Sequence, residues 1–145
     1  MSDVIEIETR VEASQQVVWR CLTQSDDIHQ WWNDQISLDP KLGGRFNEPF
    51  KHTDGSAGLT TGMVVEFAEP DTLQLSIRDK GSPNATRVSV HLTSVGRRTD
   101  LVLTHVGWDM YPPGERDQLK SAYQEGWKTH IEKLKAHCEA EVKKG

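Results

Sequence analysis

The sequence predicts an α+β fold in which a curved antiparallel sheet of about seven strands wraps around one long C-terminal helix. Three observations support this prediction. Most of the chain consists of short runs in which apolar and polar residues alternate, as in strands with one buried face. The connections between neighbouring runs are only a few residues long, which is typical of antiparallel hairpins. The last stretch has the period of a helix, and it is the one element long enough to cover the sheet.

The N-terminal elements are a strand and two short helices. Residues 4–11 alternate between apolar and charged side chains and predict a strand. Ser14 is a suitable N-cap for a helix over residues 15–22. Ser25 can cap a second helical segment over residues 26–30, which leads into a pair of adjacent tryptophans.

Six further strands are predicted after these helices. Residues 38–50 read as two strands joined by a turn that contains Gly43 and Gly44, and a polar loop follows over residues 52–58. The remaining connections are predicted at residues 69–71, 80–84 and 96–100. The residues predicted to face the core from the last four strands are Met63, Val65 and Phe67, then Leu73, Leu75 and Ile77, then Val88, Val90 and Leu92, and finally Leu101, Leu103 and His105.

A single long helix is predicted at the C-terminus. After a break at residues 111–114, residues 115–141 would form a helix roughly 40 Å long at 1.5 Å per residue. The apolar face of this helix consists of Leu119, Tyr123, Trp127, Ile131 (or His130) and Leu134. Because a strongly curled sheet cannot touch such a helix along its whole length, we expect a pocket between the two.

Length and charge limit the classes of function. The chain has 145 residues and a formal net charge of −5, so it predicts a single domain over residues 1–145 without the basic stripe that nucleic acid or an anionic membrane requires. No signal peptide or membrane-spanning run is recognisable, which favours a cytoplasmic location. Cys21 and Cys138 follow no metal or redox spacing, so we expect both to be reduced packing residues.

Six segments carry a resemblance to a known family. In order they are VEASQQVVWRCLT, WW, LGGRF, GMVVEFAEPDTLQLSI, TDLVLTHVGW and EGWKTHIEKL. Together they resemble the activator-of-heat-shock-chaperone-ATPase (AHSA)-like family of the START-related, birch-pollen-allergen-like SRPBCC superfamily, over roughly Ile5 to Glu139. The resemblance implies a helix-grip fold, with a seven-stranded sheet around the C-terminal helix and a deep cavity that often takes an apolar ligand.

Aromatic residues and glycines mark the expected cavity. Neighbouring residues of a regular element point in different directions, so we assign one of Trp31 and Trp32 to the cavity mouth and the other to packing. Packing of both rings without a ligand is the preferred alternative. Gly43 and Gly44 are interpreted as backbone devices at a turn or bulge. Gly126, inside the long helix, indicates close helix–sheet packing or the approach of a ligand, and packing is the preferred interpretation.

Histidines are the main candidates for polar roles. His105 is predicted to face the hollow, where it could orient a ligand or act as an acid or base together with Tyr123. The preferred alternative is a buried histidine that is hydrogen-bonded to a neighbouring side chain. His91 is expected to face solvent, and His130 and His137 lie two turns apart, too far to share a metal ion. We therefore predict no catalytic residue, no metal and no cofactor.

The preferred function is that of a small-molecule carrier or sensor for an apolar, aromatic or lipid-like ligand. The alternatives are an enzyme of the cyclase or hydrolase type in the same cavity, and a protein-binding module that modulates a chaperone ATPase. We expect no nucleic-acid or membrane partner, and the oligomeric state is left open as monomer or homodimer. The predicted ligand-binding residues are Trp31, Trp32, Phe46, Met63, Val65, Leu75, Ile77, Val90, Leu103, His105, Tyr123 and Trp127.

Overall fold

Seven antiparallel strands form one sheet in the computed structural model, which describes residues 4–52, 54–82 and 84–144. Residues 53 and 83 fall in the predicted loop at 52–58 and turn at 80–84 and lie outside the described residues. The strand order in the sheet is β1-β7-β6-β5-β4-β3-β2. The elements are β1 (Ile5–Val11), α1 (Gln15–Thr23), α2 (Ser25–Trp31), β2 (Ser37–Leu38), β3 (Arg45–Lys51), β4 (Ala57–Ala68), β5 (Thr72–Asp79), β6 (Thr86–Val95), β7 (Arg98–Val106), the 3-10 helix η1 (Trp108–Met110) and α3 (Pro113–Lys144).

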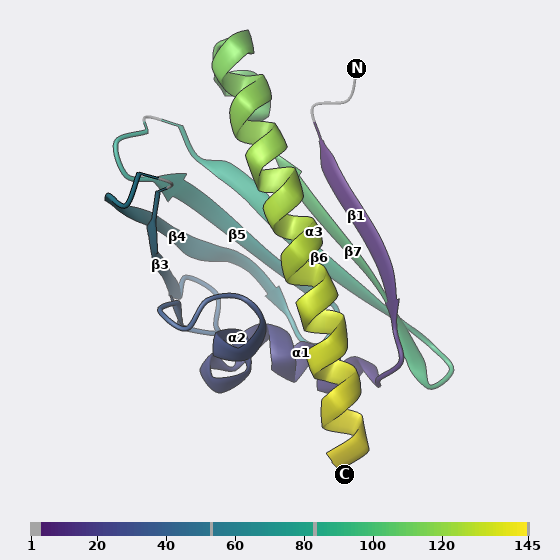
Figure 1. Ribbon diagram of the computed structural model, residues 1–145. Coiled ribbons are helices and arrows are strands. Elements are labelled where there is room, and N and C mark those ends of the chain that lie inside the picture. The colour runs from purple at the N-terminus through teal and green to yellow at the C-terminus, as the bar shows by residue number, and fades with distance from the viewer. Residues whose placement is uncertain (1–3, 53, 83, 145) are drawn as a thin grey trace.

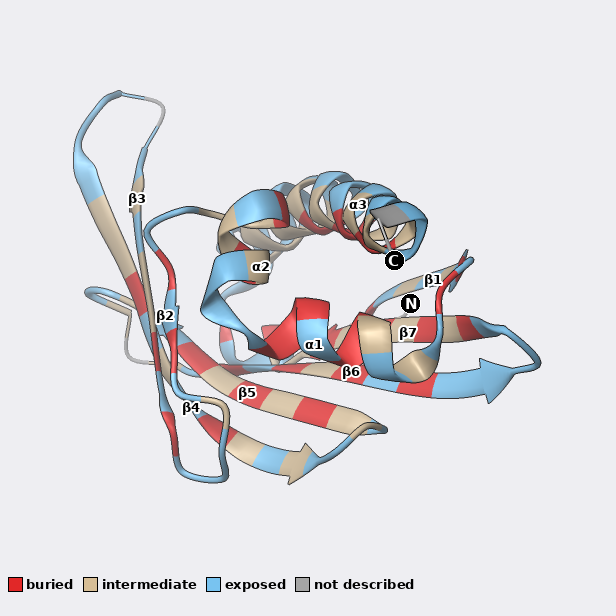
Figure 2. Ribbon diagram, turned by 90° about the horizontal axis from the view of Figure 1, so that it is seen from below, coloured by how far each residue is buried: buried red, intermediate tan, exposed pale blue. Residues whose placement is uncertain are grey.

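The predicted fold class is confirmed. Helix α3 runs across one face of the sheet, and α1 and α2 lie near the C-terminal end of α3 (Figure 1). In Figure 2, strands β3 and β4 rise at one edge of the sheet and β1 rises at the other, so the sheet curls around the helix. Such curvature follows from the right-handed twist of strands. Among the described helices, none combines the length and the apolar composition that a bilayer crossing needs.

Helix α3 is longer than predicted, at 32 residues instead of the 27 of the predicted range 115–141. It begins at Pro113, because proline is favoured in the first turn, where its missing N–H leaves no hydrogen bond unmade. From Trp127 onward it is firmly buried, through Trp127, Ile131, Leu134 and Cys138. Its N-terminal half is only partly covered at Leu119 and Tyr123, and this difference leaves room between that half and the sheet.

The predicted inward face of β4 is wrong at Met63. The side chain of Met63 is 48% exposed, whereas the next residue, Val64, is 1% exposed. The pairing of β4 with β5 is irregular between Val64 and Glu66, so the half-buried Val65 is an extra residue in a β-bulge. The bulge reverses the alternation of the strand, and after it Phe67 packs against the core. Met63, Val64 and Val65 are all apolar, so the sequence pattern is consistent with either Met63 or Val64 as the inward-facing residue. The inward residues predicted for the last three strands are all buried: Leu73, Leu75, Ile77, Val88, Val90, Leu92, Leu101, Leu103 and His105.

The predicted backbone role of Gly43 and Gly44 is confirmed. Gly43 has a φ of +80°, a conformation that side chains disfavour. A Cβ atom on Gly44 would lie 2.0 Å from the carbonyl oxygen of Asp39, so only glycine fits there. The Gly43 N–H donates to the Val64 carbonyl, and the Val64 N–H donates to the Gly44 carbonyl. These bonds tie the turn to the bulged strand β4.

Cys21 and Cys138 are buried and contact each other across the interface of α1 and α3. Both residues have 0% exposure. The hydrogen bond between the two thiols and their burial raise the pKa of Cys138. We therefore expect a thiol reagent such as Ellman's reagent to label the native protein on the order of 1,000-fold more slowly than the urea-unfolded protein, because labelling requires opening by several kcal/mol. Rapid labelling of two thiols in the native protein would contradict this buried pair.

Candidate functional site

A cavity of about 780 Å³ lies between the N-terminal half of α3 and the curled edge of the sheet. Its walls come from α2 and the segment that follows it, from the inner faces of β3, β4 and β5, and from α3. This volume is within the range of pockets that hold small molecules in proteins. The pocket predicted between sheet and helix is therefore present in the structure.

The two adjacent tryptophans have different environments, as the sequence suggests. Trp31 is 2% exposed, and its indole N–H donates to the Cys21 carbonyl at 2.8 Å, so it is a packing residue with one edge on the cavity. Trp32 is half-buried, and its ring lies 5.3 Å from Phe46 and 5.2 Å from Trp127. The two rings do not point in opposite directions but stack at 5.3 Å. The reason is that α2 ends at Trp31, so Trp32 leaves the regular helix.

Gly126 leaves open space on the helix side of the cavity. It lines the cavity, and an added Cβ atom would meet no atom within 4 Å. The interpretation of Gly126 as a close helix–sheet packing position is therefore wrong. Glycine in a helix interior costs about 1 kcal/mol of stability relative to alanine. At position 126 the glycine enlarges the cavity and does not permit a close contact between helix and sheet.

A row of polar side chains crosses the inner face of the sheet. In the strand pairing, Glu48 of β3 lies opposite Thr60 of β4, and Thr60 lies opposite Asp79 of β5. The Thr60 hydroxyl donates to Asp79 Oδ1 at 2.7 Å, and the Tyr123 hydroxyl of α3 donates to the same oxygen at 2.8 Å. All four residues line the cavity. We call Glu48, Thr60 and Asp79 the polar row.

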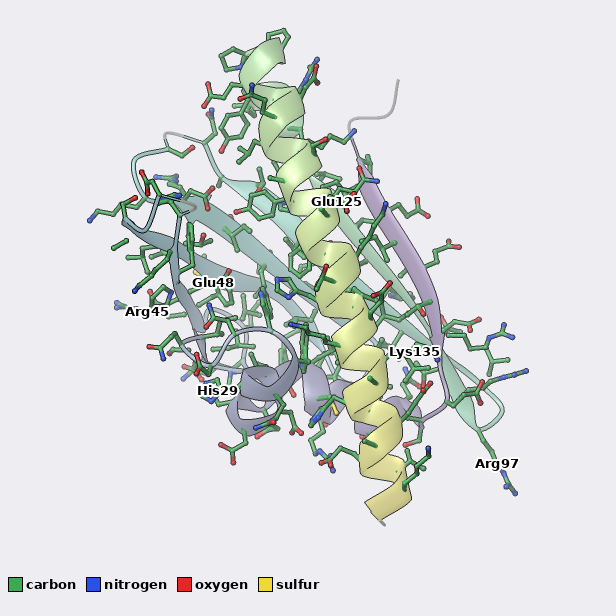
Figure 3. The ribbon with its side chains drawn as sticks, in the orientation of Figure 1. His29, Arg45, Glu48, Arg97, Glu125 and Lys135 are labelled. Atoms are coloured by element: carbon green, nitrogen blue, oxygen red, sulfur yellow. The ribbon has the colours of Figure 1, made fainter. Side chains whose placement is uncertain are left out.

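Glu48 has an unusual environment for a carboxyl group. It lies on the side of β3 that faces the cavity, whereas Arg45 of the same strand points away (Figure 3). Burial raises the pKa of Glu48 to about 7, and the charge of Asp79 adds to this rise. Hydrogen bonds from Asn33 and Trp32 oppose it without cancelling it. Carboxyl groups with strongly raised pKa values in a cleft are frequent at functional sites.

His130 and Tyr123 complete the α3 side of the cavity. The buried Nδ1 atom of His130 has no hydrogen-bond partner among the described residues. Burial and the neighbouring Lys133 lower the pKa of His130 to about 4, so its imidazole is neutral at pH 7. Burial and Asp79 raise the pKa of Tyr123, which therefore stays a hydroxyl donor.

His105 is a structural histidine, which was the preferred interpretation. It has 0% exposure, and its Nδ1 accepts a hydrogen bond from the Trp127 indole N–H at 3.0 Å. Because indole N–H can only donate, His105 Nε2 carries the proton and donates to Thr86 Oγ1 at 2.7 Å. Burial lowers the pKa of His105 to about 3, so the ring remains neutral. His91, predicted to face solvent, is exposed and hydrogen-bonded to Thr72.

The predicted ligand-binding residues fall into three groups. Those on the large cavity are Trp31, Trp32, Ile77, Tyr123 and Trp127. Leu75, Val90 and Leu103 line a small apolar void of about 20 Å³ next to it. The residues on neither space are Phe46, Met63, Val65 and His105. The sequence-based prediction missed Glu48 and Asp79, although both continue an inward-facing alternation, with Glu48 between Phe46 and Phe50 and Asp79 two residues after Ile77.

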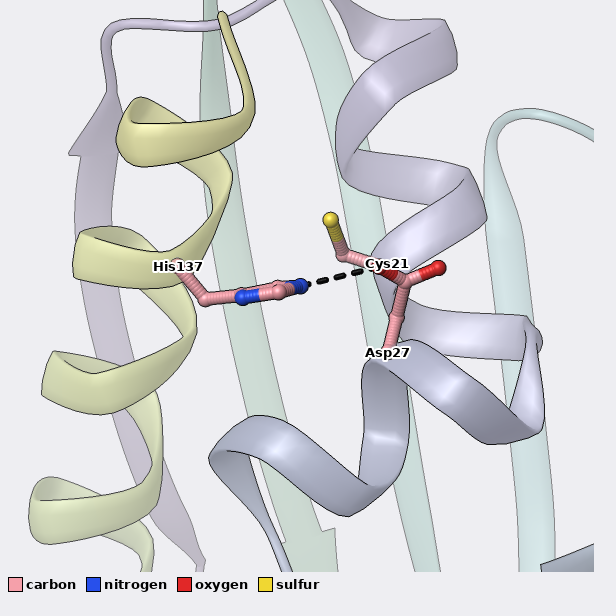
Figure 4. A group of neighbouring side chains, drawn as sticks. All are labelled: Cys21, Asp27 and His137. Atoms are coloured by element: carbon pink, nitrogen blue, oxygen red, sulfur yellow. Dashed lines mark hydrogen bonds and ion pairs between the residues drawn. The ribbon is translucent and has the colours of Figure 1, made fainter. Parts of the chain in front are cut away.

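A second cluster lies where α1, α2 and α3 meet (Figure 4). Ligand-type atoms of Cys21, Asp27 and His137 lie within 4.8 Å of one another, and His137 Nε2 is 2.8 Å from Asp27 Oδ1. These residue types can bind zinc, but the other oxygen of Asp27 is already 3.4 Å from the guanidinium of Arg20. The Asp27 carboxylate is thus shared between His137 and Arg20, and we assign the cluster to holding the three helices together.

The curled sheet, the gripped C-terminal helix and the cavity between them define a domain of the helix-grip class. The chain belongs to the Activator of Hsp90 ATPase homolog 1-like family, whose sequence profile matches residues 12–139. This family was expected from the sequence, and the match confirms it. No curated protein matches the chain.

Solved structures with the same fold come from several bacteria. Protein MLL2253 from Mesorhizobium loti is 22% identical, with a TM-score of 0.76 over 92% of this chain and 95% of that chain. Protein CV1439 from Chromobacterium violaceum is 19% identical, with a TM-score of 0.77 over 96% and 99% of the two chains. CalU16 from Micromonospora echinospora is 22% identical, with a TM-score of 0.71 over 97% and 79%. At these identities the similarity establishes the fold alone.

Proposed function

We propose that this protein binds a small molecule with an apolar or aromatic body in the cavity between α3 and the sheet. The observation that carries this proposal is the open space beside Gly126, in a cavity that Trp32, Tyr123 and Trp127 also line. Glycine in a helix interior costs about 1 kcal/mol relative to alanine, and no packing contact of Gly126 with a described residue explains that cost.

The aromatic wall supplies the driving force for binding. Burial of apolar surface contributes about 25 cal/mol per Å², so a ligand that buries roughly 250 Å² gains about 6 kcal/mol before the cost of association. The polar groups of the cavity then select among ligands of similar size. This division of roles fits a carrier or a sensor.

Binding is favoured over the enzyme alternative because of where His105 lies. That alternative was based on His105 acting with Tyr123, but His105 is fully buried and both of its ring nitrogens are engaged in hydrogen bonds. Tyr123 is engaged with Asp79. Neither group is free to exchange a proton with a ligand.

A leucine at position 126 is expected to block the cavity while leaving the fold intact. We expect Gly126→Leu to weaken binding of the fluorescent apolar probe N-phenyl-1-naphthylamine by about tenfold or more, equivalent to 1.4 kcal/mol. The same change should raise helix stability by roughly 0.5–1 kcal/mol, because leucine has the better helix propensity. Fluorescence titration and urea denaturation measure the two effects.

Gly114→Leu is the matched control for this experiment. Gly114 is also a helical glycine of α3 whose added Cβ would meet no atom within 4 Å, but it lies outside the cavity. The Gly114→Leu variant should bind the probe like the wild type. Equal affinities of Gly126→Leu and the wild type would show that the probe does not enter this cavity.

A further inference from the structure

The polar row brings two acidic residues into a cavity with aromatic walls. Glu48 and Asp79 are separated by one strand, and adjacent strands lie about 4.8 Å apart, so their backbones are roughly 10 Å from each other. Both side chains line the cavity, and they are close enough for the charge of Asp79 to act on Glu48. A cationic group of a ligand could therefore contact both carboxylates at once.

The described residues offer no counter-ion to this pair. No described lysine, arginine or histidine forms an ion pair with Glu48 or Asp79. The donors that reach Asp79 are the neutral hydroxyls of Thr60 and Tyr123, and both go to Oδ1. Both residues are half-buried, and charges that are partly shielded from water are commonly paired in proteins.

The surrounding groups also fit a cation. Trp32 and Trp127 present aromatic rings to the cavity, and cations are attracted to the faces of such rings. The imidazole of His130 is neutral at pH 7, as described above, and its free Nδ1 adds no positive charge. Among the described residues that line the cavity, Lys133 is the one lysine, and it is exposed on α3.

We propose that the ligand is an organic ammonium ion, whose charged nitrogen lies between Glu48 and Asp79 and whose apolar body lies against Trp32 and Trp127. This inference rests on the proposed binding function and specifies the chemical class of the ligand. The raised pKa of Glu48 agrees with it, because a bound cation would supply the charge that allows this carboxyl to ionise.

Three naphthalene probes of similar shape test the proposal. They are 2-(1-naphthyl)ethylammonium, the neutral 2-(1-naphthyl)ethanol and the anionic 1-naphthylacetate, each titrated into the protein at pH 8 by calorimetry. We expect the ammonium probe to bind about 10- to 100-fold more tightly than the alcohol, since hydrogen bonds between charged groups are markedly stronger than neutral ones. The anionic probe should bind most weakly.

Two variants test whether Glu48 and Asp79 cause the preference for the ammonium probe. Glu48→Gln and Asp79→Asn should each reduce the ratio of ammonium-probe affinity to alcohol affinity by about tenfold. Glu66→Gln is the control, because Glu66 is exposed on β4 and lies outside the cavity. Glu48→Gln keeps the test valid if Asp79→Asn disturbs the hydrogen bonds from Thr60 and Tyr123.

The possible outcomes separate this inference from the proposed function. Binding of the alcohol as tight as that of the ammonium probe would overturn the cation proposal and leave small-molecule binding in place. The same holds if the anion binds most tightly, or if the ammonium preference survives in both variants. Failure of all three probes and of N-phenyl-1-naphthylamine to bind would overturn the binding function itself.

Discussion

Replacing Trp127 with alanine is expected to destabilise the fold by about 4 kcal/mol or more. Truncation of a buried tryptophan typically costs 3–5 kcal/mol, since it removes apolar contacts and leaves a cavity. Trp127 is 4% exposed and lies 5.2 Å from the ring of Trp32. It also donates the hydrogen bond that satisfies Nδ1 of His105, and an unsatisfied buried acceptor adds about 1–3 kcal/mol.

Urea denaturation followed by circular dichroism measures this loss. The total stability of a domain is about 5–15 kcal/mol, so the variant should unfold at a much lower urea concentration than the wild type. Trp127→Phe is the matched control, because it removes the N–H donor and keeps an aromatic ring with most of the apolar area, although the ring is smaller than indole. We expect it to cost about 1–2 kcal/mol. An unchanged urea midpoint for Trp127→Ala would contradict the position assigned to Trp127 between His105 and Trp32.

The architecture could be predicted because each element has a strong local signal. The alternation in β5, β6 and β7 runs for several residues with polar neighbours, so only one phase buries the apolar side chains. The signal failed at Met63, where Met63, Val64 and Val65 are all apolar and the bulge determines which one is buried. A bulge depends on pairing with another strand, and the sequence of one strand does not record it.

The acidic pair of the cavity illustrates a different limit of sequence analysis. Glu48 and Asp79 are far apart in the sequence, and they become neighbours only because Thr60 pairs with both. A search for two acidic groups with a fixed spacing cannot detect such a pair. The available signal was weaker and local, namely a glutamate on the inward face of β3 between Phe46 and Phe50. A charged residue at an inward position is costly, so it indicates a function better than an exposed one does.

Gly126 and His105 show how tertiary contacts decide between interpretations that a sequence leaves open. A glycine inside a helix predicts either close packing or open space, and only the position of the sheet distinguishes the two. For His105, the strand phase predicted the direction of the side chain correctly, but the indole of Trp127 occupies the position beside it. His105 does not line the cavity, whereas Tyr123, Gly126 and Trp127 of α3 do, and the ring of Tyr123 lies 4.9 Å from that of His105.

Replacing Glu48 with glutamine is expected to stabilise the ligand-free protein at pH 8 by up to about 3 kcal/mol. The pKa of Glu48 is about 7 in the folded protein, against 4.5 as its ordinary value. Each pKa unit corresponds to about 1.4 kcal/mol, which gives this magnitude. Below pH 4.5 the carboxyl is protonated in both states and makes no difference to stability. As the pH rises from 4.5 to 7, the unfolded chain loses its proton first, so the wild type loses stability over this range.

Glutamine stays neutral at every pH and has nearly the same shape, so the variant avoids this loss. Urea denaturation of both proteins between pH 4 and pH 8.5 should therefore give curves that coincide at low pH and diverge with rising pH. The contributions of His105 and His130 cancel in the difference, because both proteins contain them, and the exposed Glu66→Gln variant should follow the wild type. Parallel curves for Glu48→Gln and the wild type would contradict the buried environment of Glu48. Glu48 would thus lower the stability of the ligand-free protein at neutral pH. Such a cost is typical of residues that serve binding, because these residues are often not the ones that maximise stability.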